Sequence, residues 1–150
     1  MRRYITGVNA EGRSCFVDEG EVTPASAPGI EGLKFASLYS VDQSPPSARP
    51  EQAGHHVDTR LPAGHMRWTV VDHPPHVAGD APTMATEMHH SDAIDFVVVL
   101  EGSTTIILDE GERVLYPGDC LVFNGVDHAM EAGPEGSRVL TLAVGTPPPD

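Results

Sequence analysis

Residues 87–102, EMHHSDAIDFVVVLEG, and residues 117–131, PGDCLVFNGVDHAME, decide the fold expected for this chain. Both stretches join a short apolar run to a turn, and β-branched runs bounded by Gly or Pro are typical of strands. They also carry side chains able to bind a metal or move a proton: His89, His90, Asp95 and His128. Any chemistry then depends on whether the two stretches bring these side chains together.

The rest of the chain has the same strand-like character. Its 14 prolines and 15 glycines interrupt every segment long enough for an amphipathic helix. We therefore expect an all-β protein with one core, built as a single domain over residues 1–150. The expected strands are 14–17, 33–40, 66–72, 94–100, 103–108, 112–116, 120–124, 128–131 and 137–144, with turns at 102, 109–111, 117–119, 124–125 and 133–134.

Charge and composition exclude several classes of partner. The formal net charge is -13 with only nine Lys and Arg, which opposes binding to nucleic acid or to an anionic membrane surface. The sequence shows no secretory leader and no apolar run long enough for a membrane span, so we expect a cytoplasmic protein. Two cysteines are too few for a disulfide framework. A small-molecule partner fits this composition.

The residues quoted above resemble the two half-motifs of the cupins, over residues 87–144. The matching features are Asp95 with Gly102 seven residues later, the turn at 117–119, and His128. The resemblance implies a cupin double-stranded β-helix, which is a jelly-roll barrel. Residues 1–86 would then form an N-terminal extension of strands and loops, and residues 145–150 a frayed tail.

The same resemblance implies one divalent metal ion, Fe, Mn, Ni or Zn, because three histidines and a Glu bind a metal in the family. This chain departs from that pattern, since Asp95 stands in place of the Glu. One histidine position falls on Met88 or Ser91, depending on the register. The remaining ligands would be His89 or His90, with Asp95 and His128.

The choice between His89 and His90 stays open on spacing alone. On an unbroken strand, His89 and Asp95 share a side, which favours His89. The usual cupin register favours His90 instead. A Met88-His89 pair and the triplet 94–96 also resemble a subgroup of stand-alone cupins that includes cupin-domain oxidoreductases of polyketide pathways, and that match favours His89.

These features predict a small-molecule enzyme, metal-assisted, acting on an oxygenated or carbonyl-containing metabolite by oxidation, isomerisation, dehydration or decarboxylation. Asp95 and His128 would be catalytic. The expected pocket residues are His65, Trp68, Phe96, Phe123 and Met130. The alternative is a non-catalytic or metal-free cupin that binds a small ligand.

Two further expectations concern surfaces. The four histidines outside these stretches and outside the pocket set stand in or beside polar loops, so we interpret them as surface residues: His55, His56, His73 and His76. An open jelly roll also leaves strand edges that a second copy commonly covers. We therefore expect a homodimer, with residues 1–41 placed to contribute to its interface.

Overall fold

The computed structural model describes residues 2–8, 14–27, 31–41, 61–77, 79, 83, 85–109 and 111–148. All regular structure in these ranges is strand, so the all-β expectation is confirmed. The strands are β1 (Arg2–Val8), β2 (Ser14–Glu21), β3 (Ala25–Ser26), β4 (Lys34–Val41), β5 (Met66–His73), β6 (Ala93–Leu108), β7 (Gly111–Leu115), β8 (Cys120–Asn124) and β9 (Ala129–Gly145). Within these ranges, no helix is long and apolar enough to cross a membrane.

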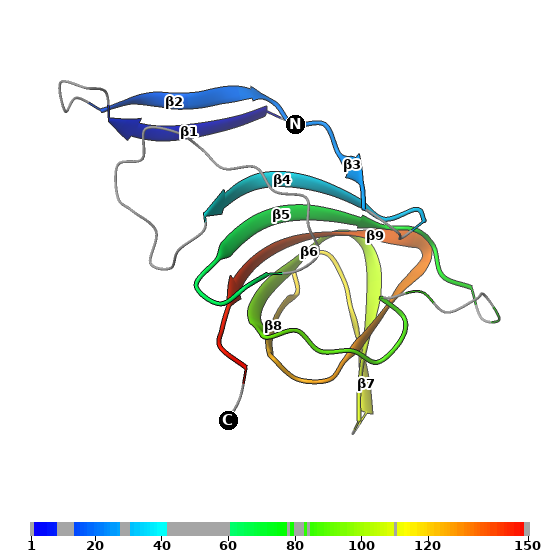
Figure 1. The fold of residues 1–150 in the computed structure, drawn as a ribbon. Helices are drawn as coiled ribbons and strands as arrows, with labels where there is room; N and C mark the ends of the chain where they lie inside the picture. Colours follow the sequence, from blue (N-terminus) through cyan, green and yellow to red (C-terminus); the bar gives the residue numbers. More distant parts are fainter. Residues whose placement is uncertain are drawn as a thin grey trace.

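The strands form two antiparallel sheets. β1 and β2 pair only with each other, while the larger sheet has the order β3-β4-β5-β9-β6-β7, with β8 also paired to β6. Figure 1 shows this larger sheet curving from β4 over β5 and β9 and round to β7 and β8, so that it has a concave and a convex face. The β1–β2 hairpin lies on the convex side.

Two long, bent strands hold the sheet together. The first half of β6 pairs with β8, its second half pairs with β7, and β9 runs along both halves. The bend falls at register shifts on either side of Gly102, which has a φ of 70°. A Cβ at Gly102 would collide with the carbonyl oxygen of Gly136, so only glycine permits this approach.

This bend corrects two of the expected turns. We expected separate strands on either side of 102 and of 133–134, but β6 and β9 each continue through these positions. Gly102 acts as a bulge within β6 because the two strands cross there at close range, and a bulge bends a strand without ending it. The remaining expected strands overlap β2, β4, β5, β7 and β8, with bounds that differ by one residue at 33 and at 116.

Alternation along the strands separates two apolar clusters. The concave face carries the main core, which includes Val71, Val97, Val99 and Val139. Their sequence neighbours point the other way, and the convex face of β4 and β5 carries a second cluster of Ala36, Leu38 and Val70, against which Val22 and Leu140 pack. The period of two in a strand therefore places each residue on one face or the other.

Candidate functional site

One row of residues crosses the concave face and brings the polar side chains together. Arg67 on β5 pairs with Ala143 on β9, Ala143 pairs with Asp95 on β6, and Asp95 pairs with Phe123 on β8. Directly paired residues of neighbouring strands project to the same side of a sheet. The register therefore sets a guanidinium, a methyl, a carboxyl and a phenyl ring side by side.

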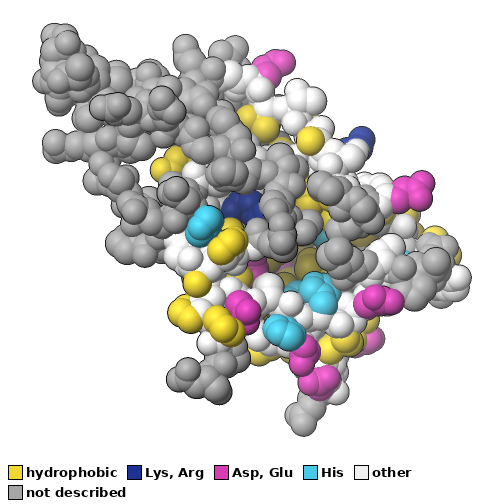
Figure 2. Space-filling view, viewed as in Figure 1, with side chains coloured by type: hydrophobic (Ala, Val, Ile, Leu, Met, Phe, Trp, Pro, Cys, Tyr) yellow, Lys and Arg dark blue, Asp and Glu magenta, His cyan; other side chains and the backbone are white. Residues whose placement is uncertain are grey.

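This row borders a cavity of about 630 Å³. Cavities of this size hold small organic ligands. Figure 2 shows histidine and carboxylate side chains gathered on one face of the molecule, beside apolar atoms. The side chains at the polar end of the cavity are Arg67, His89, His90, Asp95, His128 and Thr141, and its apolar wall includes Phe35, Val71, Val97, Phe123, Met130 and Val139.

His89 and His128 meet across a short bridge. His89 lies before β6 and His128 before β9, and each backbone N–H donates to the carbonyl of the other at 2.9 Å. Their ring centroids are 4.6 Å apart. His90 instead lies at the rim, with its side chain 60% exposed and its Nδ1 3.3 Å from Asp127 Oδ1. Of the two neighbouring histidines, His89 is therefore the one that faces His128.

The hydrogen bonds of both rings determine their tautomers. Nδ1 of His89 lies 2.8 Å from the carbonyl oxygen of Glu87, and Nδ1 of His128 lies 2.8 Å from that of Val126. A carbonyl oxygen only accepts, so each Nδ1 carries a proton and, in the neutral ring, each Nε2 keeps its lone pair. Both imidazoles are thus prepared to act as a base or as a metal ligand.

Burial tunes the two central groups in opposite ways. His128 is 6% exposed and stacks on Phe123 at a centroid distance of 3.8 Å. Removal from water lowers the pKa of His128, so its neutral form is favoured. Burial also raises the pKa of Asp95, although His128 and a hydrogen bond from Ser91 act in the other direction. An imidazole that resists protonation therefore adjoins a carboxyl that accepts a proton more readily than usual.

The metal ion expected from the sequence needs several donor atoms close together. In the neutral rings of His89 and His128 the lone pair is on Nε2, and Asp95 lines the same cavity. Across the described ranges, however, no three His, Cys, Asp or Glu side chains are gathered closely enough to hold a metal ion. The arrangement fits a two-imidazole donor pair with a carboxyl nearby, not a closed three-ligand site.

Comparison with curated proteins finds two relatives. The chain is 28% identical over 127 residues to the cupin-domain-containing oxidoreductase fogC of Aspergillus ruber, covering 84% of this chain and 61% of the relative. It is also 28% identical over 127 residues to the cupin-domain-containing oxidoreductase virC of Hypocrea virens, covering 84% and 64%. The chain thus spans less than two thirds of the length of either relative. No family model matches the chain.

Solved structures share the fold at low sequence identity. The cupin domain of Cnp3 from Schizosaccharomyces pombe superposes with a TM-score of 0.57 at 12% identity, covering 96% of this chain and 87% of that one. The chain has the cupin fold. The polyketide cyclase RemF from Streptomyces resistomycificus superposes with a TM-score of 0.54 at 21% identity, covering 86% and 78%. The cupin resemblance and the jelly-roll barrel expected from residues 87–144 are confirmed.

Of the five expected pocket residues, two line the cavity and three do not. Phe123 and Met130 line the cavity, as expected. Trp68 and Phe96 do not, because each is the sequence neighbour of an inward residue and so points to the convex face, where they are 42% and 45% exposed. His65 does not line the cavity either and precedes β5, where its carbonyl accepts a hydrogen bond from Gly145.

Arg67 and His73 are among the cavity residues that the sequence did not predict. Arg67 lies on the same face as Thr69 and Val71, and only the pairing of β5 with β9 shows that this face points inward. The expectation that His73 and His76 are surface residues is wrong, because His73 lines the main cavity and both line an adjoining one of about 90 Å³. His55 and His56 lie outside the described residues. His73 ends β5, and that position gave no signal of burial in the sequence.

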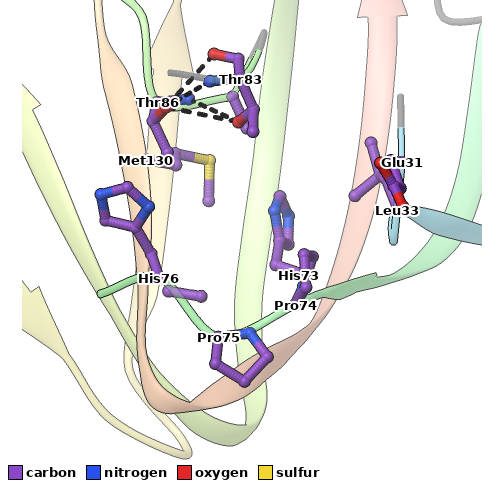
Figure 3. Close-up of a pocket in the computed structure, with 11 residues that line it drawn as sticks. Glu31, Leu33, His73, Pro74, Pro75, His76, Thr83, Thr86 and Met130 are labelled. Carbon is purple, nitrogen blue, oxygen red and sulfur yellow. Dashed lines mark hydrogen bonds between the residues drawn. The ribbon is translucent and has the colours of Figure 1, made fainter. Parts of the chain in front are cut away.

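Figure 3 shows the smaller cavity, with Met130 projecting between His73 and His76. Thr83 and Thr86 hydrogen-bond one another on one side of it, including a bond of 2.7 Å from the Thr83 N–H to the Thr86 hydroxyl. Burial lowers the pKa of His73 to about 4, against the attraction of Asp72. His73 is therefore neutral at physiological pH and separates the two cavities as an uncharged wall.

Proposed function

We propose that this cupin is an enzyme that binds a small oxygenated or carbonyl-containing metabolite in the 630 Å³ cavity and moves a proton on it. The observation that carries the proposal is the pair of imidazoles whose Nδ1 atoms are held by backbone carbonyls, beside a half-buried carboxyl. Groups with shifted pKa values in a ligand-sized cavity are typical of catalytic sites. The relatives named as oxidoreductases and the fold neighbour named as a polyketide cyclase support an enzyme.

The proposed roles follow from the positions of the side chains. Nε2 of His128 would accept a proton from a C–H or O–H group of the substrate, while the carbonyl of Val126 holds the ring through Nδ1. Asp95, in its protonated form, would donate a hydrogen bond to the developing oxyanion. Phe123 fixes the plane of the His128 ring by stacking. Positioned proton transfer of this kind contributes roughly 10²–10⁴-fold to a rate.

A divalent metal ion is the alternative to this direct proton transfer, because Nε2 of His128 can accept a proton or bind a metal but cannot do both. His89 and His128 would hold Fe, Mn, Ni or Zn through Nε2, with Asp95 as the nearby carboxylate. Such an ion would supply Lewis-acid polarisation of a carbonyl oxygen. Elemental analysis after incubation with each metal tests this part, because stoichiometric metal should fall to trace levels in both His89→Ala and His128→Ala. Trace metal in the unmodified protein would remove the ion from the proposal.

Exchange of carbon-bound hydrogen for deuterium tests the proton transfer without knowledge of the natural substrate. Enolisable ketones, α-hydroxy ketones and β-keto acids are incubated with the protein in D₂O and followed by NMR. We expect accelerated exchange for at least one class, with the acceleration lost in His128→Ala. Probes that bind without any accelerated exchange would instead support a cupin that binds a small ligand and does not turn it over.

That non-catalytic alternative is favoured by one observation. Across the described ranges, the third ligand of a closed metal centre is missing. A binding protein needs only the cavity and a few polar contacts. The exchange experiment separates the two functions, because both require binding and only one requires proton transfer.

A further inference from the structure

Among the residues that the structure describes, Arg67 is the one Lys or Arg whose side chain lines the main cavity. It is 9% exposed, in a chain that has nine Lys and Arg in total and a formal net charge of -13. A guanidinium keeps its positive charge when buried and offers five N–H donors, so one that lines a cavity favours an anionic ligand group there.

The sheet leaves room beside this guanidinium. Arg67 and Asp95 both pair with Ala143, from opposite sides, so their α-carbons stand two strand spacings apart, roughly 10 Å. The residue between them carries only a methyl group. Arg67 interacts electrostatically with Asp95 across this space. A guanidinium has five N–H donors, so it can bind a ligand oxygen and keep its interactions with the protein.

The cavity becomes apolar away from Arg67. Two residues further along the strands the inward row contains Thr141 and Val97, which pair directly. Two residues beyond that, the inward row contains Phe35, Val71 and Val139. All five side chains line the cavity. A ligand that matches this lining has an apolar body and places its polar group at the Arg67 end.

We propose that Arg67 binds a carboxylate or phenolate oxygen of the substrate, so that the cavity selects an apolar, ring-sized acid whose anionic group lies beside Asp95 and His128. That this ligand is a substrate rests on the proposed function, whereas the preference of the cavity for an anionic ligand does not. Arg67 would orient the ligand so that the atoms next to its acidic group face the imidazoles. The substrate class is therefore a hydrophobic or aromatic acid, not a neutral ketone.

Calorimetry with a matched pair of probes tests this assignment. 2-Naphthoate and 2-naphthamide have nearly the same shape and differ in charge. A charge-assisted hydrogen bond contributes about 1.5–3 kcal/mol, so we expect the acid to bind the unmodified protein at least ~10-fold more tightly than the amide. Arg67→Gln should abolish this preference and leave the affinity for the amide unchanged.

Two further variants make the result specific. Lys34→Gln removes one positive charge from an exposed position outside the cavity, and it should retain the full preference for the acid. Arg67→Lys keeps the charge but loses the planar fork, so it should retain a reduced preference. Equal affinity of the unmodified protein for 2-naphthoate and 2-naphthamide would overturn the proposal. A preference for 2-naphthoate that persists in Arg67→Gln would overturn it as well.

Failure of this inference and failure of the proposed function are distinguishable. Accelerated deuterium exchange on neutral ketones, without any preference for 2-naphthoate, would overturn the role of Arg67 and leave the enzyme standing. A preference for 2-naphthoate that depends on Arg67, without exchange on any probe, would support the anion site and remove the catalytic function.

Discussion

The two faces of β5, β9, β6 and β8 differ in where they place polar and apolar side chains, and the difference is the opposite of the usual burial of apolar groups and exposure of polar ones. The concave face buries Arg67 and His128 and encloses Asp95, whereas the convex face exposes large apolar side chains. Trp68 pairs with Leu142, Leu142 with Phe96, and Phe96 with Val122, so these four form one continuous convex stripe. Three of them are 42–46% exposed. Buried polar groups and exposed apolar patches are the placements that carry functional information.

The comparison assigns the proposed reaction to the concave face and contact with another protein surface to the convex face. Polar groups on the concave face cost stability, because burial opposes their charged forms. That cost is consistent with a site retained for function. The apolar groups of the convex stripe form no hydrogen bonds with water, so burying them against another surface is favourable. We propose that this stripe is the contact of the homodimer expected from the sequence.

The largest effect on turnover is expected at Asp95, which lies on the concave face of β6. Its neighbour Phe96, on the convex face, serves as the control. Asp95→Leu, which removes the hydrogen-bond donor, should lower turnover of a metabolite found by the exchange screen by roughly 10²–10³-fold. Because burial raises the pKa of Asp95, the folded state disfavours its carboxylate, so the same variant should unfold at higher temperature at neutral pH. Phe96→Leu should leave turnover unchanged. Equal losses in both variants would erase the distinction between the faces.

His73 provides a pH test of burial at the inner end of β5. Its pKa is about 4 in the folded protein and 6.5 in the unfolded chain, so the unfolded state binds more protons between these values. The resulting stability is complete above pH 6.5 and is lost as the pH falls toward 4. It amounts to about 3 kcal/mol.

The check is urea unfolding at neutral and acidic pH, comparing the unmodified protein with His73→Gln. We expect the variant to lose less stability between the two conditions than the unmodified protein does. Asp95 acts with the opposite sign in acid, but it is present in both proteins, and the difference between them isolates His73. Parallel pH profiles would show that His73 is not held in its neutral form.

The smallest effect on folding is expected on the convex face. A Trp68→Ser, Phe96→Ser double variant removes two half-exposed side chains, and it should change the free energy of unfolding by only about 1 kcal/mol. Light scattering should nevertheless show a dimer mass for the unmodified protein and a monomer mass for the variant. Leu108→Ser, at the far end of β6, is the matched control, since Leu108 is also 43% exposed. A monomer mass at all concentrations of unmodified protein would contradict this interface.

The contrast between the faces also shows what the sequence could predict. Strand-sized runs and turn residues predicted most of the strands. The cupin resemblance implied that His89 or His90, Asp95 and His128 belong to one site, and these residues line one cavity. The assignment of Trp68 and Phe96 to the pocket was wrong, because the face that points inward depends on pairing with β9. Arg67 was missed for the same reason. Long-range register is set by partners more than 40 residues away, which local patterns do not contain.

The central claim is that His89 and His128 both present an unprotonated Nε2 to the cavity, and imidazole NMR tests it most directly. Long-range ¹H–¹⁵N spectra at neutral pH distinguish the two neutral tautomers, and His89→Gln and His128→Gln assign the signals. We predict that the proton of each neutral ring is on Nδ1. A neutral ring with its proton on Nε2 would contradict the account, because that nitrogen could then neither accept a proton nor bind a metal.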